Sequence, residues 1–303
     1  MNSARPIRYI LVITLVLCTA WSAALRVLPR PALAESNYEA NRLRMENWML
    51  GPAAPAVLVG TSISGRLLPA DFDGTRLAGL ANLGLDGASP ETGLRLVLMR
   101  EPPAPLVLLE MHLLGKRPGL NDRQLLDLAT GVGLKVSRYL PLTRADARPS
   151  TVLYGWLKSK QVGTEIAAES EVAAAPDTAT DPALAATNAA AMDPEWLDRI
   201  GPLIRRIQER GSRVVLVRLP AGKNDPASPE SPNEADQIAG ELGVPLVDLL
   251  RRARRERLTV SYSDGLHLSP PSAHAVAGLL VTALENEGLV QPARQGNEPN
   301  RNQ

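Results

Sequence analysis

The chain has little cysteine, few aromatic residues and almost no net charge. Cys18 is the only cysteine among 303 residues, which excludes an internal disulfide and any metal site built from several cysteines. Aromatic residues make up 3% of the chain. Lys and Arg total 33 against 32 Asp and Glu, so the sequence lacks the excess positive charge that nucleic-acid binding requires. We therefore expect no nucleic-acid partner.

Histidine is also scarce, and this argues against a metal centre. The chain has 3 histidines, and no pair has the H-x-x-x-H spacing that binds zinc on a helix. We expect neither a metal nor a cofactor. The basic run Arg251–Arg255 is interpreted as a solvated helix face, although an acidic polysaccharide could also use it.

The N-terminal segment is the longest apolar run. Residues 10–25 are apolar apart from small hydroxyl side chains, with arginines on both sides. The run approaches the ~17–25 residues that cross a bilayer as a helix. We predict an uncleaved single-pass anchor in residues 1–34, with the following domain on the periplasmic side of the inner membrane. The alternative is a signal peptide cleaved after Ala32-Leu-Ala34, which would leave a secreted or periplasmic protein.

Beyond the anchor, short apolar runs alternate with helix-like segments. Residues 35–290 are expected to form an α/β domain and residues 291–303 a disordered tail. Residues 163–192 are rich in Ala, Thr, Asp, Glu and Pro, without aromatic side chains, and predict a flexible insertion, with a frayed helix as the alternative because alanine favours helix. The predicted strands are Ala56–Val59, Leu77–Leu83, Leu106–Met111, Arg213–Leu219 and Val244–Val247. The predicted helices are Glu35–Leu50, Glu91–Arg100, Asp122–Leu128, Gly133–Tyr139, Asp193–Arg210, Asn233–Leu242 and residues 270–287. This alternation predicts a three-layer α/β/α sandwich around a mostly parallel, flavodoxin-like sheet of five strands.

Chemically active residues follow several of these strands. Ser62, in Gly60-Thr-Ser62, directly follows the first strand, where a tight turn can expose its hydroxyl or simply cap a helix. Asp264-Gly-Leu-His267 places a carboxylate and an imidazole three residues apart, so that the carboxylate can orient the ring. Gly87, after the second strand, can bring a backbone N–H to an oxyanion. Ligands collect at the carboxyl ends of such strands, so we expect these residues to meet.

Together these motifs resemble the SGNH (GDSL-like) hydrolase superfamily. Gly60-Thr-Ser62 matches its first block, Asn82-Leu-Gly-Leu-Asp-Gly87 its second and Asp264-Gly-Leu-His267 its last. The resemblance implies a nucleophile at Ser62, a base at His267 oriented by Asp264, and an oxyanion held by the amides of Ser62 and Gly87.

The third block departs from the family pattern. The expected Gly-x-Asn is absent after the third strand, where Met111-His-Leu-Leu114 stands instead. His112 or the more distant Asn121 could supply the missing oxyanion donor. Loss of one such donor costs roughly 10²–10³ in rate, so the alternative is a slow or inactive member.

The predicted membrane anchor narrows the functions expected of a protein that resembles this superfamily. Similar tethered proteins of bacterial envelopes O-acetylate exopolysaccharides such as alginate, or transfer D-alanyl groups to lipoteichoic acid, beside a membrane-bound O-acyltransferase. The resemblance thus implies an exported serine acyltransferase or esterase that acts on a polysaccharide or acyl ester through an acyl-serine. The alternatives are a periplasmic carbohydrate esterase or lipase-like hydrolase, and an inactive glycan-binding subunit of an acetylation complex.

Overall fold

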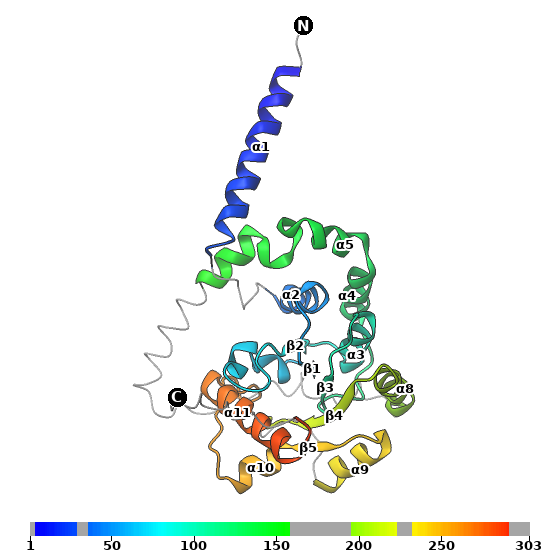
Figure 1. Cartoon of the computed structure of the whole chain (residues 1–303). Coiled ribbons are helices and arrows are strands. Elements are labelled where there is room, and N and C mark those ends of the chain that lie inside the picture. Colours follow the sequence, from blue (N-terminus) through cyan, green and yellow to red (C-terminus); the bar gives the residue numbers. More distant parts are fainter. Residues whose placement is uncertain (1–3, 29–35, 158–194, 223–231, 291–303) are drawn as a thin grey trace, which may run out of the picture.

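The computed structural model describes residues 4–28, 36–157, 195–222 and 232–290 (Figure 1). The predicted insertion at 163–192, the cleavage site at Ala32–Ala34 and the tail at 291–303 lie outside these residues. Helix α1 (Ala4–Ala24) projects away from the α/β domain. Within it, Pro6–Ala24 has a mean hydropathy of 1.8 and is long and apolar enough to cross a membrane, as a signal sequence would also be.

The centre of the domain is a five-stranded, wholly parallel sheet in the order β2-β1-β3-β4-β5. Its strands are β1 (Ala56–Gly60), β2 (Ala81–Gly84), β3 (Leu106–Glu110), β4 (Arg213–Arg218) and β5 (Leu246–Asp248). Strands β1 and β3 are buried along their whole length, because helices cover both faces. Strand β2 lies on one side of β1, and β3 and the later strands lie on the other, so the direction in which strands are added reverses between β1 and β3. Open sheets of this kind bind ligands at that point.

Helices form a layer on each face of the sheet. One face packs against α2 (Asn37–Leu50), α3 (Pro90–Met99), α8 (Trp196–Glu209) and α9 (Pro232–Leu242), with α4 (Leu120–Thr130) contributing from its edge. The other face packs against α10 (Leu249–Arg255), α11 (Pro270–Asn286) and the residues around the 3-10 helices η1 (Ser64–Arg66) and η2 (Pro69–Phe72). Alternate strand residues supply the two cores, as the period of two requires. The predicted three-layer α/β/α sandwich is confirmed.

The remaining helices lie at the end of the domain from which α1 rises (Figure 1). They are α5 (Val132–Tyr139), the 3-10 turns η3 (Pro141–Thr143) and η4 (Ala145–Ala147), and helical residues 149–157. The indole of Trp21 in α1 donates a 2.7 Å hydrogen bond to the carbonyl of Ala147. This bond attaches the base of α1 to that end of the domain.

Two boundary predictions were wrong. The second strand begins at Ala81 and not at Leu77, because residues 77–80 form a turn in which Gly79 has a φ of 80°. Leu77 and Leu80 are buried all the same, and this explains their misleading pattern. The fifth strand spans Leu246–Asp248 and not Val244–Val247. Ser269 occupies the predicted cap position of α11, but its side chain makes no capping hydrogen bond.

Candidate active site

The structure brings Ser62, His267 and Asp264 into one hydrogen-bonded chain. Ser62 Oγ lies 2.7 Å from His267 Nε2, although 205 positions separate the two residues. His267 Nδ1 lies 2.6 Å from Asp264 Oδ2. Since the carboxylate accepts from Nδ1, Nε2 is left to accept the serine proton. This geometry matches the nucleophile, base and orienting acid of a serine acyl-transfer site.

Ser62 lies in a turn that a buried carboxylate holds from beneath. We call residues 60–64 the serine turn. Glu110, at the carboxyl end of β3, is fully buried and accepts hydrogen bonds from the backbone N–H of Thr61 at 2.8 Å and of Ser64 at 3.2 Å. The Thr61 hydroxyl lies 3.2 Å from the same carboxylate. The adjacent strand thereby fixes the backbone on both sides of Ser62.

Gly60 allows this close approach. A Cβ at Gly60 would stand 2.2 Å from Glu110 Oε2 and 2.5 Å from Ser64 Oγ, far inside van der Waals contact. Glycine is therefore required for the carboxylate to reach the serine turn. Glu110 was missed by the sequence analysis. The available signal was a single charged residue at the end of an otherwise apolar buried strand.

Asp264 and His267 lie in a short loop that holds itself together. We call residues 262–268 the Asp-His loop; Tyr262 and Leu268 form an antiparallel bridge at its base. Asp264 Oδ1 accepts from the backbone N–H of His267 at 2.7 Å and of Leu266 at 3.0 Å. Gly265, with a φ of 77°, makes the turn between them. The loop also joins the segment after β4, because Gly222 N–H donates to the Leu266 carbonyl.

The electrostatics favour an ionised Asp264. Burial works to raise the pKa of Asp264, but hydrogen bonds from the His267 backbone and imidazole and from the Leu266 amide outweigh it. The pKa of this carboxyl is therefore held below its usual value. Its side chain is 51% exposed, whereas that of His267 is 14% exposed. The imidazole is thus shielded while its carboxylate partner touches solvent.

The second block places Gly87 in an exposed turn beyond β2. Gly87 has a φ of 67°, which favours glycine, and a Cβ there would meet nothing within 4 Å. Asn82, from the same block, ties η1 to β2 by donating to the carbonyls of Ser64 and Leu67. Helix α2 supports the turn from the other side: Asn41 exchanges two hydrogen bonds with the Asp86 backbone.

A cation that the sequence analysis did not single out lies beside Gly87. Lys116 Nζ donates to the Gly87 carbonyl at 2.6 Å. Burial lowers the pKa of Lys116, and the nearby Asp122 carboxylate opposes that effect. The lysine thus fixes the loop that carries Gly87 and adds positive potential at this corner of the sheet.

The residues at the position of the third block directly follow β3, as expected, but none of them has an amide side chain. His112 is 9% exposed and lies two residues beyond the end of β3, while Leu113 has a left-handed φ of 55° that is uncommon for leucine. Asn121 is exposed in the first turn of α4. The roles of His112 and Asn121 as oxyanion donors stay predictions.

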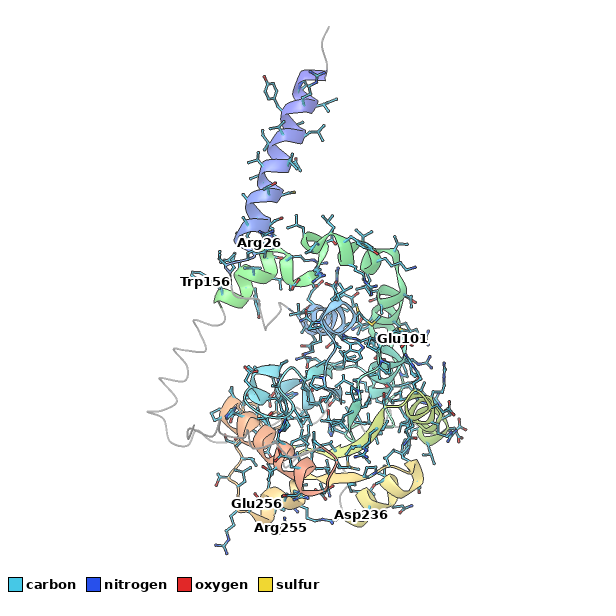
Figure 2. All side chains as sticks on the ribbon, in the orientation of Figure 1. Arg26, Glu101, Trp156, Asp236, Arg255 and Glu256 are labelled. Carbon is cyan, nitrogen blue, oxygen red and sulfur yellow. The ribbon has the colours of Figure 1, made fainter. Side chains whose placement is uncertain are left out.

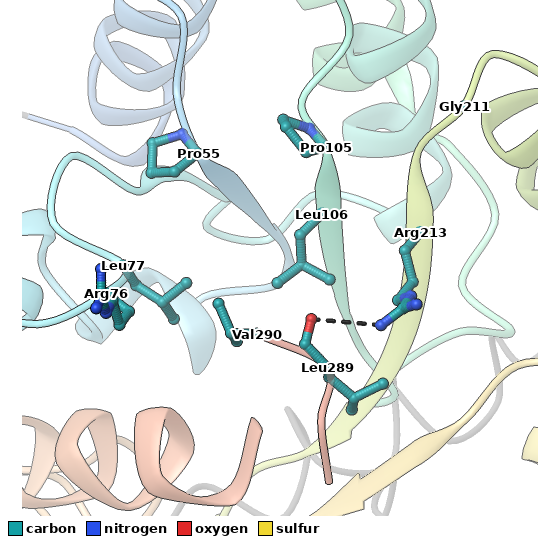
Figure 3. Close-up of a pocket in the computed structure, with 9 residues that line it drawn as sticks. All are labelled: Pro55, Arg76, Leu77, Pro105, Leu106, Gly211, Arg213, Leu289 and Val290. Carbon is teal, nitrogen blue, oxygen red and sulfur yellow. Dashed lines mark hydrogen bonds between the residues drawn. The ribbon is translucent and has the colours of Figure 1, made fainter. Parts of the chain in front are cut away.

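A cavity elsewhere in the domain is distinct from this site (Figure 3). Its volume is about 370 Å³, and it lies at the amino ends of β1, β3 and β4, where Pro55, Leu106 and Arg213 line it. Ser62 follows the carboxyl end of β1, so the cavity and Ser62 lie at opposite ends of the parallel strands. Among the described residues, no group of three or more His, Cys, Asp or Glu could hold a metal ion.

Comparisons with known proteins find distant structural likeness and no matching sequence. No protein-family model matches the chain, and no curated protein sequence matches it significantly. Among solved structures, TesA is 15% identical with a TM-score of 0.36, over 76% of this chain and 98% of TesA. A proposed acylhydrolase from Bacteroides fragilis is 16% identical with a TM-score of 0.40, over 83% of this chain and 98% of that one.

The order of elements and the positions of the blocks can be compared with the pattern expected from the sequence. A serine follows β1, a left-handed glycine follows β2, and the Asp-His loop precedes the last helix, all on a parallel sheet with helices on both faces. The chain therefore has a three-layer α/β/α fold around a parallel five-stranded sheet, and these blocks follow the order expected from the resemblance to SGNH (GDSL-like) hydrolases.

Proposed function

We propose that this protein is a membrane-anchored SGNH-like serine acyltransferase that O-acetylates a cell-envelope or extracellular polysaccharide. The observation that carries the proposal is the continuous Ser62–His267–Asp264 chain, with contacts of 2.7 and 2.6 Å. Helix α1 supports the membrane location by its length and composition. The domain would then lie on the periplasmic side, where envelope glycans are accessible.

The reaction follows from the positions of the three side chains. Ser62 Oγ attacks the acyl carbonyl while His267 Nε2 accepts the serine proton, and Asp264 stabilises the imidazolium that forms. The amides of Ser62 and Gly87 donate to the oxyanion, with His112 or Asn121 as a further donor. Collapse of this intermediate expels the donor's alkoxide or thiolate, which takes the proton from His267. A glycan hydroxyl then attacks the acyl-serine while His267 Nε2 takes its proton. The bond between the acyl carbon and Ser62 Oγ breaks, and His267 returns the proton to Oγ, which restores the free enzyme.

A non-enzymatic function has one observation in its favour. The residues after β3, Met111–Leu114, are all buried and include no amide side chain to complete the oxyanion site. A glycan-binding subunit of an acetylation complex would tolerate that change, whereas an efficient enzyme must replace the donor. A plain periplasmic esterase is the intermediate case, in which water takes the place of the glycan.

The division of the acetyl group between glycan and water distinguishes a transferase, an esterase and a binding subunit. The full chain in detergent would receive a chromogenic acetyl ester, with and without a soluble polysaccharide such as deacetylated alginate. A transferase is expected to make O-acetylated glycan at the expense of free acetate. An acetate yield that the glycan leaves unchanged would indicate an esterase for that acceptor. No turnover and no acetyl group on Ser62 by mass spectrometry would favour the binding subunit and contradict the proposal.

A further inference from the structure

Exposed apolar side chains gather at one end of the domain. Beyond Leu28, ten large apolar side chains of the described residues are exposed, and seven of them lie in or directly after two helical segments. We call these seven the apolar ridge: Val132, Val136, Tyr139, Leu140, Leu153, Trp156 and Leu157. A soluble surface rarely concentrates its apolar side chains in this way unless that surface binds something.

The ridge is made of two amphipathic stripes. Val132, Val136 and Tyr139 lie in α5 and Leu140 directly follows it; this spacing places the four on one face of the helix. The opposite face of α5 is buried through Leu134 and Ser137. Residues 153, 156 and 157 form a similar stripe on helical residues 149–157. Each segment therefore packs on the domain by one face and presents an apolar face outward.

The ridge is continuous with the base of the apolar helix α1. Trp21 donates to the carbonyl of Ala147, which lies between the two stripes in sequence. Figure 1 shows α1 rising from the end of the domain that these segments form, and Figure 2 draws Trp156 and Arg26 at that same end. If α1 crosses a bilayer, the ridge lies at the level where the helix leaves it.

The composition of this end fits a lipid surface. Tyr139 is 84% exposed and Trp156 is 48% exposed, and both residue types favour the boundary between headgroups and acyl chains. Residues 131–157 contain four basic side chains (Lys135, Arg138, Arg144 and Arg148) and one acidic side chain, Asp146, which is buried. Arg148 pairs with Glu39, whereas Lys135 and Arg138 are exposed on α5. Exposed aromatic and basic side chains together are typical of a surface that binds anionic phospholipid.

We propose that the apolar ridge is a second membrane contact, immersed in the interface of an anionic bilayer beside α1. This proposal rests on the membrane anchoring in the proposed function and deepens it. Two points of attachment fix the orientation of the domain, where a single helix would leave it free to swing. Helix α2, which hydrogen-bonds the loop before Gly87, also packs against η4 beneath the ridge through Glu46 and the Ala145 N–H. The orientation of the active site relative to the bilayer would thereby be set.

Site-directed spin labelling of the full chain tests the proposal. Cys18, the only cysteine, would be replaced by serine. Tyr139→Cys and Leu153→Cys would report on the ridge, Leu11→Cys on the anchor, and Arg255→Cys on the far end of the domain (Figure 2). Nitroxide collision rates with oxygen and with a water-soluble nickel chelate would be measured in vesicles of phosphatidylethanolamine and phosphatidylglycerol. Circular dichroism melting would verify that each variant is folded.

The expected result is an intermediate depth at both ridge positions. Their labels should favour oxygen over nickel and lie roughly 5–10 Å into the interface. The Leu11 label should lie deep in the bilayer, and the Arg255 label should behave as in water. Lys135→Glu with Arg138→Glu should make the ridge labels shallower in vesicles with phosphatidylglycerol, and less so in pure phosphatidylcholine.

Three outcomes would overturn the proposal. Ridge labels that behave as in water while the Leu11 label is deep would leave the anchor intact and refute the second contact. Ridge labels shielded from both reagents would show that protein covers the ridge, either residues 158–194 or a membrane-embedded partner. A Leu11 label in water would refute the anchor, and the ridge contact with it, without touching the catalytic assignment, which is measured separately by ester turnover.

Discussion

The serine turn and the Asp-His loop meet at one hydrogen bond but are held in different ways. The serine turn is buried and depends on Glu110, which lies 46 to 49 positions away on another strand. The Asp-His loop is largely exposed, and Asp264 accepts its hydrogen bonds from residues two and three positions later. A site of this kind therefore joins one half fixed by the fold to one half fixed by its own sequence.

The largest expected effect comes from breaking the bond between the two halves. Ser62→Ala or His267→Ala should lower kcat/KM for an acetyl ester by about 10⁴–10⁶-fold, because nucleophile and base act as one unit. The double variant should cost no more than either single one. His274→Ala is the matched control, since His274 is 73% exposed and lies 3.4 Å from Asp71 instead of a serine. Equal losses in the His274 and His267 variants would contradict the account.

Asp264→Asn tests whether the Asp-His loop orients the His267 imidazole. The change should lower kcat by roughly 10³–10⁴-fold, because an amide favours the wrong imidazole tautomer. The backbone hydrogen bonds to Oδ1 can survive, so the fold should remain. Steady-state kinetics of the purified variant, with its melting temperature as control, would check this. A loss below tenfold would mean that Asp264 does not orient His267 during the reaction.

The same carboxylate predicts a pH dependence of stability. The folded-state pKa of Asp264 is lowered, so its ionised form stabilises the fold above the unfolded pKa of about 3.9. That contribution is lost as the pH falls through the lower folded-state value. Urea unfolding of wild type and Asp264→Asn should therefore show a difference at pH 6 that shrinks at pH 3. A difference that grows at pH 3 would reverse the assigned direction of the pKa shift.

Substitution of Glu110 tests the serine turn, which is held in place by another strand of the fold. Glu110→Ala leaves the buried N–H groups of Thr61 and Ser64 without their acceptor, at a cost of about 1–3 kcal/mol each in the free energy of unfolding. It should also lower kcat more than it raises KM, because Ser62 loses its position. Glu110→Gln keeps an acceptor oxygen and should recover part of both effects.

A second buried glutamate provides the control for Glu110. Glu46 is 4% exposed and accepts from the Ala145 N–H, away from the serine turn. Glu46→Ala should destabilise the protein by a similar amount while the folded fraction keeps its kcat. If the two alanine variants lowered kcat equally, the positioning role of Glu110 would be wrong.

Gly265 is expected to give the smallest effect. Alanine there must adopt a φ near 77°, which costs about 1–2 kcal/mol for a residue with a Cβ. Gly265→Ala should lower the melting temperature by a few degrees and kcat several-fold, because the turn sets the distance from Asp264 to His267. Gly211→Ala, at a φ of 88° near the other edge of the sheet, should cost similar stability with kcat unchanged.

These differences also explain how much the sequence could predict. Asp264-Gly-Leu-His267 was visible because its hydrogen bonds are local, and the parallel sheet of five strands followed from the alternation of apolar runs and helices. The charge of Glu110 stood out at the end of an apolar strand, but its role could not be predicted because that role depends on the register of β1 and β3, which a linear pattern does not contain. Leu77 was assigned to a strand because burial alone, without extended backbone, gives the same apolar signal. The apolar ridge also required the fold, because the sequence does not show which of its apolar side chains are exposed.

The most direct measurement of the central claim is covalent labelling of the serine. The full chain in detergent would be treated with a fluorophosphonate and the adduct located by mass spectrometry. We predict stoichiometric modification of Ser62 in wild type and in His274→Ala, and none in His267→Ala. No adduct on Ser62, under conditions in which a known serine esterase reacts fully, would contradict the claim that Ser62, His267 and Asp264 form an activated nucleophile.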